Sequence, residues 1–246
     1  MLARFIDDIV LLYENGIGDL DRVVDILQDD GKFLATMVSL AQQPKCGTTV
    51  LTQLSNGIEM LERRGEHEVA LQLSQEILKS STQRDDPILV GLANQIGNDG
   101  IIRNHLVKSK WDFTATDHLG TTIDQKRFED NVSLIVFFSS EQQQSERILH
   151  AVSSLSKALA GRPVQYVFVE VAEKTTSNHR LANSKNVKSP ILLTNLEQPN
   201  NYLKQCPTRR FPYLVLIDKN GIVDSINISL SAVLTRIEYL LSKNPD

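Results

Sequence analysis

The stretch Val132–Ser145 combines a predicted strand with a helix start, an arrangement that can bind a negatively charged group. An almost continuous apolar run at Val132–Phe138, rich in β-branched and aromatic residues, predicts a fully buried strand. Ser139 and Ser140 predict the cap of a following helix, because each has a glutamine three residues later, as in a capping box. Free backbone N–H groups and the helix dipole at such a start favour an anion or a thiolate. The stretch contains no cysteine, so the pattern predicts the site without the thiol.

The residues after Trp111 predict the sheet that would position this helix start. Predicted strands cover residues 132–138, 164–171, 190–195, 212–218 and 221–228, and predicted helices cover 140–159 and 232–242. The sequence Asp218-Lys219-Asn220-Gly221 is a strong hairpin turn signal between the last two strands. This order predicts a βαβ unit followed by a ββα unit, with helices on both faces of one sheet.

Residues 1–105 predict helices only. Apolar residues at three-and-four spacing mark helices over residues 2–13, 20–28, 33–42, 50–64, 66–80 and 87–96, and the pattern breaks near Asn98-Asp99-Gly100. The stretch Leu54–Leu78 predicts a helical hairpin with its turn at Arg64-Gly65 and a close helix crossing at Ala70. It resembles one unit of a tetratricopeptide-type repeat, and the alternative is a plain antiparallel bundle. We therefore predict an all-helical domain over 1–108 and a second domain over 109–246.

Composition excludes several classes of protein. With 246 residues, 41% hydrophobic and 23% charged, the chain is typical of a soluble globular protein. A net charge of −4 argues against nucleic acid as a partner. No apolar run approaches the roughly 20 residues that span a bilayer, and Asp7 and Asp8 interrupt the apolar start, so we expect neither a membrane span nor a signal peptide. This favours the cytoplasm by default, or the bacterial envelope if the true start is missing. The sequence does not determine the oligomeric state.

The two cysteines, Cys46 and Cys206, lie in different halves of the chain. A disulfide framework or a zinc site needs clustered ligands, which these cysteines and the five scattered histidines do not form. We therefore expect no metal site and no cofactor.

The order of elements after Trp111, with several short motifs, resembles the thioredoxin fold, more narrowly its TlpA/ResA-type and peroxiredoxin-like (AhpC/TSA) branch. The matching motifs are a leading hairpin at Phe113–Ile123 with Gly120 at its turn, the entry to the central sheet at Phe128–Phe138, the cis-proline at Phe211-Pro212-Tyr213, and the turn at Leu216–Gly221. The resemblance covers about Trp111–Ser242. It implies an α/β thioredoxin-like fold with a central mixed β-sheet flanked by helices, here preceded by the all-α domain.

In redox-active members of this family, a Cys-x-x-Cys motif follows the first central strand. The resemblance places its two positions at Gln142 and Ser145. Glutamine has no ionisable group and cannot attack a disulfide. Ser145 stands between Gln144 and Glu146, with no histidine or lysine beside it to activate the hydroxyl. The resemblance therefore implies the family's scaffold without its redox reaction.

Arg209 and Arg210 stand directly before Phe211-Pro212. In the thioredoxin fold they would lie near the helix start that follows the first central strand. Two guanidinium groups beside free N–H donors would bind an anion or an acidic peptide. The alternative is that they are solvated loop arginines or pair with Glu141 or Glu146.

Cys206 lies six residues before Pro212, close to the loop that faces the active helix in this fold. A lone cysteine there could form a mixed disulfide or sense oxidation. The alternative is a small apolar residue packed beneath the loop.

The function that we predict is binding of a protein or peptide partner by a redox-inactive thioredoxin-like protein, acting as a binding or scaffold module. Its surface would be the former active-site groove: Ser140, Glu141, Gln142, Ser145, Arg209, Arg210, Phe211 and Pro212. One alternative is a thiol–disulfide oxidoreductase or peroxide-handling enzyme that uses Cys206. Another is a purely structural thioredoxin-like domain whose helical neighbour makes the interactions.

Overall fold

The computed structural model describes residues 25–26, 28–42, 47–111, 114–117, 120–139, 141–142, 144–173 and 191–243. The predicted helix over 2–13, the first part of the helix over 20–28, and Cys46 lie outside these residues. The chain divides into two compact units. Unit 1 comprises Met1–Leu61 and Glu66–Ile101, and unit 2 comprises Glu62–Gly65 and Ile102–Asp246.

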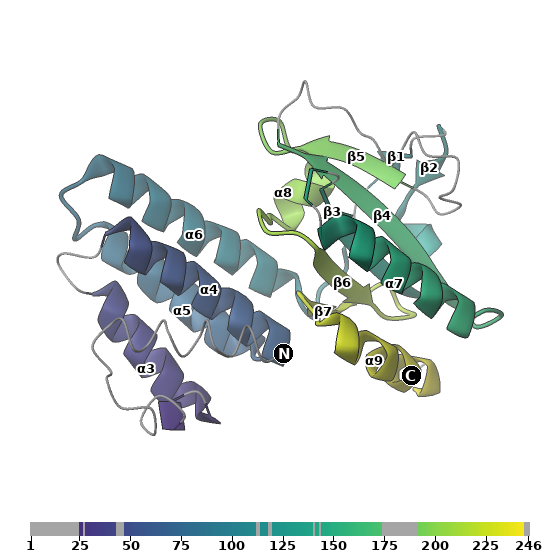
Figure 1. The fold of residues 1–246 in the computed structure, drawn as a ribbon, viewed down its shortest axis with the longest axis horizontal. Coiled ribbons are helices and arrows are strands. Elements are labelled where there is room, and N and C mark those ends of the chain that lie inside the picture. Colours follow the sequence, from purple (N-terminus) through teal and green to yellow (C-terminus); the bar gives the residue numbers. More distant parts are fainter. Residues whose placement is uncertain are drawn as a thin grey trace. The chain divides into compact units, whose positions relative to one another are not determined.

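Unit 1 is built from helices alone within its described residues (Figure 1). They are α3 (Asp30–Ala41), α4 (Thr48–Arg64), α5 (His67–Ser81) and α6 (Pro87–Leu106), with the ends of α4 and α6 counted in unit 2. Asp29 caps α3, because its carboxylate accepts a hydrogen bond from the Lys32 N–H at 3.0 Å. The predicted helices over 33–42, 50–64 and 66–80 are confirmed, with ends that differ by a few residues.

The predicted hairpin of α4 and α5 is also present. Gly65 has a φ of +83°, a left-handed conformation that glycine adopts without strain and that ends α4. Ala70 is fully buried, as a close helix crossing requires. The core of unit 1 consists of apolar residues from all four helices: Phe33, Met37, Leu40, Leu51, Leu54, Ile58, Leu61, Ala70, Leu73, Ile77 and Ala93.

One prediction for unit 1 is wrong, because the helical pattern does not break at Asn98–Gly100. Helix α6 continues without interruption to Leu106. A Cβ atom at Gly97 would lie 2.9 Å from the Ser74 carbonyl oxygen and 2.9 Å from the Leu78 Cβ. This glycine therefore allows close approach of α5 and α6, and it does not mark a turn.

Unit 2 contains a five-stranded mixed sheet with the strand order β5-β4-β3-β6-β7. The strands are β3 (Val132–Phe138), β4 (Val164–Ala172), β5 (Ile191–Asn195), β6 (Tyr213–Ile217) and β7 (Val223–Ile226). β3 pairs in parallel with β4, and β4 with β5, whereas β6 is antiparallel to both β3 and β7. A separate two-stranded hairpin, β1 (Ala115–Thr116) and β2 (Thr122–Ile123), occupies the predicted position of the leading hairpin.

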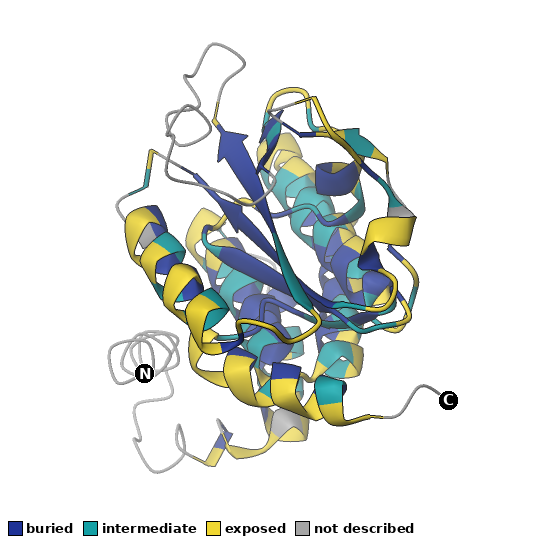
Figure 2. Cartoon of the chain, turned by 90° about the vertical axis from the view of Figure 1, so that its right-hand side faces the viewer, coloured by how far each residue is buried: buried dark blue, intermediate teal, exposed yellow. Residues whose placement is uncertain are grey.

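Both faces of the sheet are covered. In β3, Leu134, Val136 and Phe138 belong to one apolar core, and Ile135 and Phe137 belong to the other. Helices α7 (Gln144–Ala158) and α9 (Leu230–Ser242) pack on the first core. The 3₁₀ turn η1 (Gln125–Phe128), α8 (Asn201–Gln205) and the β1–β2 hairpin contribute to the second. The strands are accordingly almost wholly buried (Figure 2).

The turn between β6 and β7 lies at the predicted Asp218–Gly221. The Gly221 N–H donates to the Asp218 carbonyl oxygen at 3.1 Å, and the Asp218 carboxylate accepts from the N–H groups of Asn220 and Ile222, each at 2.9 Å. The peptide bond between Phe211 and Pro212, just before β6, is cis. The chain thus runs through β3-α7-β4 and later through β6-β7-α9, and the cis-proline lies directly before β6. Unit 2 has a thioredoxin-like fold.

The close approach of α5 and α6 leads to a test by substitution. Gly97→Ala should lower the free energy of unfolding by about 1–3 kcal/mol, because the new methyl group meets a backbone oxygen that cannot move aside. Gly91→Ala, in the same helix but with no atom within 4 Å of the added Cβ, should instead raise it by about 0.5–1 kcal/mol. Urea denaturation measures both, and equal effects at the two sites would contradict the packing role of Gly97.

Candidate functional site

The segment between β3 and α7 is a turn that two buried serines hold together. The Ser139 N–H donates to the Ser145 hydroxyl oxygen at 3.2 Å, and the Ser145 hydroxyl donates back to the Ser139 carbonyl oxygen. That carbonyl also accepts the Gln142 N–H at 3.0 Å, and the Ser139 hydroxyl accepts the Glu141 N–H at 3.4 Å. The predicted helix cap at Ser139 and Ser140 is therefore wrong. α7 begins only at Gln144, and Ser139 satisfies the groups of the turn before it.

Neither position that the resemblance assigns to a cysteine carries a nucleophile. Gln142 is half-buried, and its amide cannot attack a disulfide. Ser145 is 1% exposed, and a serine nucleophile needs a base that accepts its proton. Here that proton is held by the Ser139 carbonyl oxygen. The hydroxyl of Ser145 therefore stabilises the turn.

The second predicted segment lies at the same end of the sheet as this turn. β6 begins at Tyr213, which pairs with Phe137 near the end of β3. Because the two strands are antiparallel, the residues just before Tyr213 and just after Phe138 lie at neighbouring positions. The structure thus brings together the two segments that the sequence predicts to form one surface.

The predicted surface residues differ in exposure. Glu141, Arg209 and Arg210 are exposed, Gln142 and Pro212 are half-buried, Ser145 and Phe211 are buried, and Ser140 lies outside the described residues. Arg209 and Arg210 each interact with other groups of the chain. The pairing with Glu141 or Glu146 that the sequence analysis offers as an alternative stays a prediction.

The main-chain groups of Phe211 can be compared with the hydrogen bonds of the described residues. It precedes the first residue of β6, so it lies outside the hydrogen-bonded ladder of the sheet. Its N–H and its carbonyl oxygen make no hydrogen bond to any described residue. Main-chain groups in buried residues are paired in more than about nine of ten cases. Phe211 as a whole residue is 7% exposed, and the described residues do not supply such partners.

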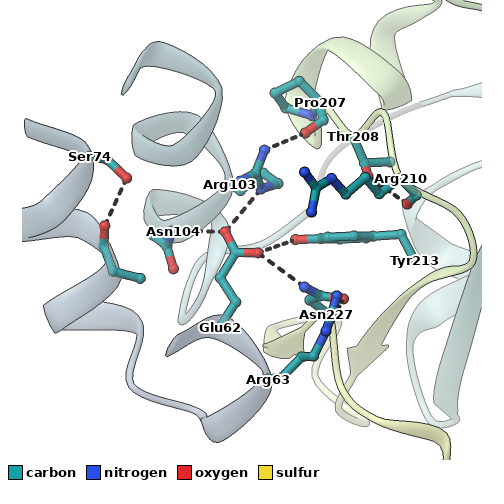
Figure 3. A network of polar contacts seen from close by, with 11 residues as sticks. Glu62, Arg63, Ser74, Arg103, Asn104, Pro207, Thr208, Arg210, Tyr213 and Asn227 are labelled. Atoms are coloured by element: carbon teal, nitrogen blue, oxygen red, sulfur yellow. Dashed lines mark hydrogen bonds and ion pairs between the residues drawn. The ribbon is translucent and has the colours of Figure 1, made fainter. Parts of the chain in front are cut away.

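A buried polar network in unit 2 was not predicted from the sequence (Figure 3). The Glu62 carboxylate, with no exposed surface, accepts hydrogen bonds from Arg103 Nε at 2.9 Å, Asn104 Nδ2 at 3.1 Å, Tyr213 Oη at 3.3 Å and Asn227 Nδ2 at 3.5 Å. These partners are 41 to 165 positions away in sequence, so no local pattern connects them. The one available signal is that Glu62 follows Ile58 by four residues, on the apolar face of α4.

Arg103 links this network to the loop before the cis-proline. Its Nη1 donates to the Pro207 carbonyl oxygen at 2.9 Å. Burial alone would lower the pKa of the Arg103 guanidinium, but the Glu62 carboxylate outweighs that effect and holds the pKa above its usual range. Arg103 is therefore positively charged, and it donates hydrogen bonds to two acceptors, the Glu62 carboxylate and the Pro207 carbonyl oxygen.

Cys206 is fully buried in the core that contains Tyr202, Leu203 and Tyr213. Burial raises the pKa of its thiol to about 12, and the nearby charges of Arg103 and Glu62 act in opposite directions. At pH 7 a thiol with so high a pKa is almost entirely protonated. The thiolate is the reactive form, so the observations favour the packing role and argue against the enzymatic one.

Two further features are absent from the part of the chain that the structure describes. It holds no group of three or more His, Cys, Asp or Glu side chains placed to bind a metal ion. None of its helices has the length and apolar character needed to cross a membrane.

Comparison with known proteins finds similar structures but no similar sequences. No protein-family model and no curated protein matches the chain. A thiol:disulfide interchange protein of the thioredoxin family from Chlorobium tepidum is 13% identical, with 55% of this chain and 97% of that chain covered and a TM-score of 0.45. The thioredoxin domain of a thiol-disulfide oxidoreductase from Bacteroides vulgatus is 12% identical, with coverages of 55% and 98% and a TM-score of 0.47. The exposed lipoprotein thioredoxin of Streptococcus pneumoniae is 16% identical, with coverages of 52% and 99% and a TM-score of 0.43.

The role of Ser145 in the turn can be tested by removing its hydroxyl. Ser145→Ala leaves the buried Ser139 N–H without its partner and should lower the free energy of unfolding by about 1–3 kcal/mol. Ser154→Ala removes an exposed hydroxyl from the same helix and should change it by less than about 0.5 kcal/mol. Thermal or urea unfolding of the two variants measures the difference, and a neutral Ser145→Ala would remove the assigned role.

The state of Cys206 can be tested by thiol labelling in a Cys46→Ser background. The native protein should react with a disulfide reagent at pH 7 only as fast as it opens, and the urea-unfolded protein should react at once. A thiol that opening exposes regains an ordinary pKa of about 8.5, so labelling should accelerate as the pH rises toward that value. Complete labelling of the native protein within the mixing time would contradict the buried thiol.

Proposed function

We propose that the thioredoxin-like unit binds an extended segment of a partner protein without redox chemistry. The observation that carries this proposal is the main chain of Phe211 beside the cis-proline, which makes no hydrogen bond to any described residue. An extended segment can supply an N–H and a carbonyl oxygen to such groups, as in strand addition, and this pairing requires no thiol. Gln142 and Ser145, the positions that the resemblance assigns to the reactive cysteines, support a binding role because neither carries a nucleophile.

The charge around Phe211 favours an acidic partner. Between Gln198 and Ile217 the sequence contains no Asp or Glu, whereas Lys204, Arg209 and Arg210 are all basic. All three residues are exposed. Arginine forms two parallel hydrogen bonds with one carboxylate, so a peptide with Asp or Glu near its pairing residue fits this surface. Glu141 and Gln142, in the turn at the same end of the sheet, would complete the surface, and Ser145 would act by holding that turn.

The proposal predicts that Arg210→Ala weakens binding of acidic peptides. An acidic peptide array should give ligands that bind the intact protein, and peptides with Gln and Asn in place of Glu and Asp should bind more weakly. For the best ligand, fluorescence anisotropy should show a loss of affinity of about 5–50-fold in Arg210→Ala, as expected for one charge-assisted contact. Added salt should also weaken binding of the acidic peptide to the wild type, because it screens the attraction between exposed charges.

Arg127→Ala is the matched control, because Arg127 is an exposed arginine elsewhere in the same unit. It should leave affinity unchanged. The same pair of variants applies to a partner captured with the intact chain from cell extract. Equal affinity of the wild type, Arg210→Ala and a Phe211→Pro variant that removes the main-chain donor would show that binding takes place elsewhere.

A further inference from the structure

We infer that Glu62 is a positioning residue for the peptide-binding main chain, an inference that rests on the proposed function. Its carboxylate is the common acceptor of the buried network in Figure 3. Through that network it sets the conformation of the loop from Pro207 to Tyr213, which contains Phe211. No part of this role involves contact between Glu62 and the peptide.

The first step of the argument is the chemistry of the network. The groups that face Glu62 all donate hydrogen bonds: the Arg103 guanidinium, the Asn104 amide, the Tyr213 hydroxyl and the Asn227 amide. A carboxylate only accepts, so it can satisfy all of them at once. A glutamine of the same shape would turn an NH₂ group toward these donors, and Arg103 would remain as a buried cation without its counter-ion. The position therefore requires a carboxylate, and size alone is not enough.

The second step is where the network holds the loop. Arg103 donates to the Pro207 carbonyl oxygen at 2.9 Å, and the Tyr213 hydroxyl donates to Glu62 at 3.3 Å. One ion pair thus holds both ends of the segment that runs from Pro207 to Tyr213. Inside it, the Thr208 hydroxyl donates to the Arg210 carbonyl oxygen at 3.2 Å. The segment between these contacts contains Phe211, whose main chain makes no hydrogen bond to any described residue.

The third step separates positioning from mere stability. A second ion pair of unit 2 joins Asp224 to Arg236 by two hydrogen bonds of 2.8 and 2.7 Å, and its carboxylate side chain is 11% exposed. It joins β7 to α9, and both of these hydrogen bonds run between those two elements and not to the loop. If Glu62 contributed only to global stability, the loss of either carboxylate would affect the loop in the same way.

Hydrogen–deuterium exchange on the full-length protein tests the inference without any peptide. Glu62→Gln should raise exchange of the amides in residues 206–213 by about tenfold or more, whereas Asp224→Asn should not. Because Glu62→Gln could fail to fold, Tyr213→Phe provides a second variant that removes only the hydroxyl contact. It should raise exchange in the same segment by a smaller factor.

The single tryptophan supplies a spectroscopic readout of the same change. Trp111 stacks on Phe137 at 6.0 Å between ring centroids, and Phe137 contacts Tyr213 edge-on at 6.4 Å. A shift of Tyr213 should therefore alter Trp111 emission in Glu62→Gln and Tyr213→Phe, and leave it unchanged in Asp224→Asn.

The outcomes separate this inference from the proposed function. Faster exchange confined to 206–213 in Glu62→Gln and Tyr213→Phe supports it, whether or not any acidic peptide binds. Exchange that rises uniformly over unit 2, or equally in Asp224→Asn, overturns it. If the loop loosens as expected and peptide affinity stays that of the wild type, Glu62 positions the loop but the loop is not the binding site, and the proposed function fails instead.

Discussion

Complete burial of β3 is the constraint on which the thioredoxin-like unit depends. All seven residues of this strand are buried, so its backbone groups must pair on both edges and its side chains must pack on both faces. β4 and β6 supply the edges, while α7 with α9 and α8 with the β1–β2 hairpin supply the faces. A parallel partner on one side requires a crossover helix. The turn between β3 and α7 is therefore forced to the end of the sheet where β6 begins.

This constraint also explains which features could be predicted from the sequence. A fully buried strand is visible as an apolar run, and the β6–β7 turn is visible because Asp218 and Gly221 have the residue types that such turns require. The start of α7 was not predictable in this way. Serine is a residue type that often caps helices, which is why the sequence predicts a cap at Ser139. The Ser145 hydroxyl instead bonds to the Ser139 N–H and carbonyl oxygen, and that contact is visible only in the folded structure.

Two other features were hidden for related reasons. Gly97 and Gly100 look like helix breakers, because a sequence shows what a glycine permits and not what lies against it. Ser74 and Leu78, on the neighbouring helix, decide that the helix continues. Glu62 was hidden because a charged residue in a helix is most often solvated, and its donors come from three distant parts of the chain. Close packing and buried charge are both properties of pairs, whereas patterns in sequence describe single segments.

Burial raises the pKa of the Cys206 thiol, and the ion pair beside it does not reverse that effect. Arg103 alone would favour the thiolate of Cys206, but Glu62 opposes it at short range, so burial decides the outcome. The ion pair of Glu62 and Arg103 thus lies beside Cys206 without favouring its thiolate.

The closed ring of hydrogen bonds between Ser139 and Ser145 has a consequence for how such a surface would work in a cell. A dithiol exists in two covalent states, so its partners can be held and released by electron transfer. Gln142 and Ser145, the positions that the resemblance assigns to such a dithiol, have a single covalent state. Occupancy of this surface would then follow partner concentration alone, and it would be the same in an oxidising and in a reducing compartment.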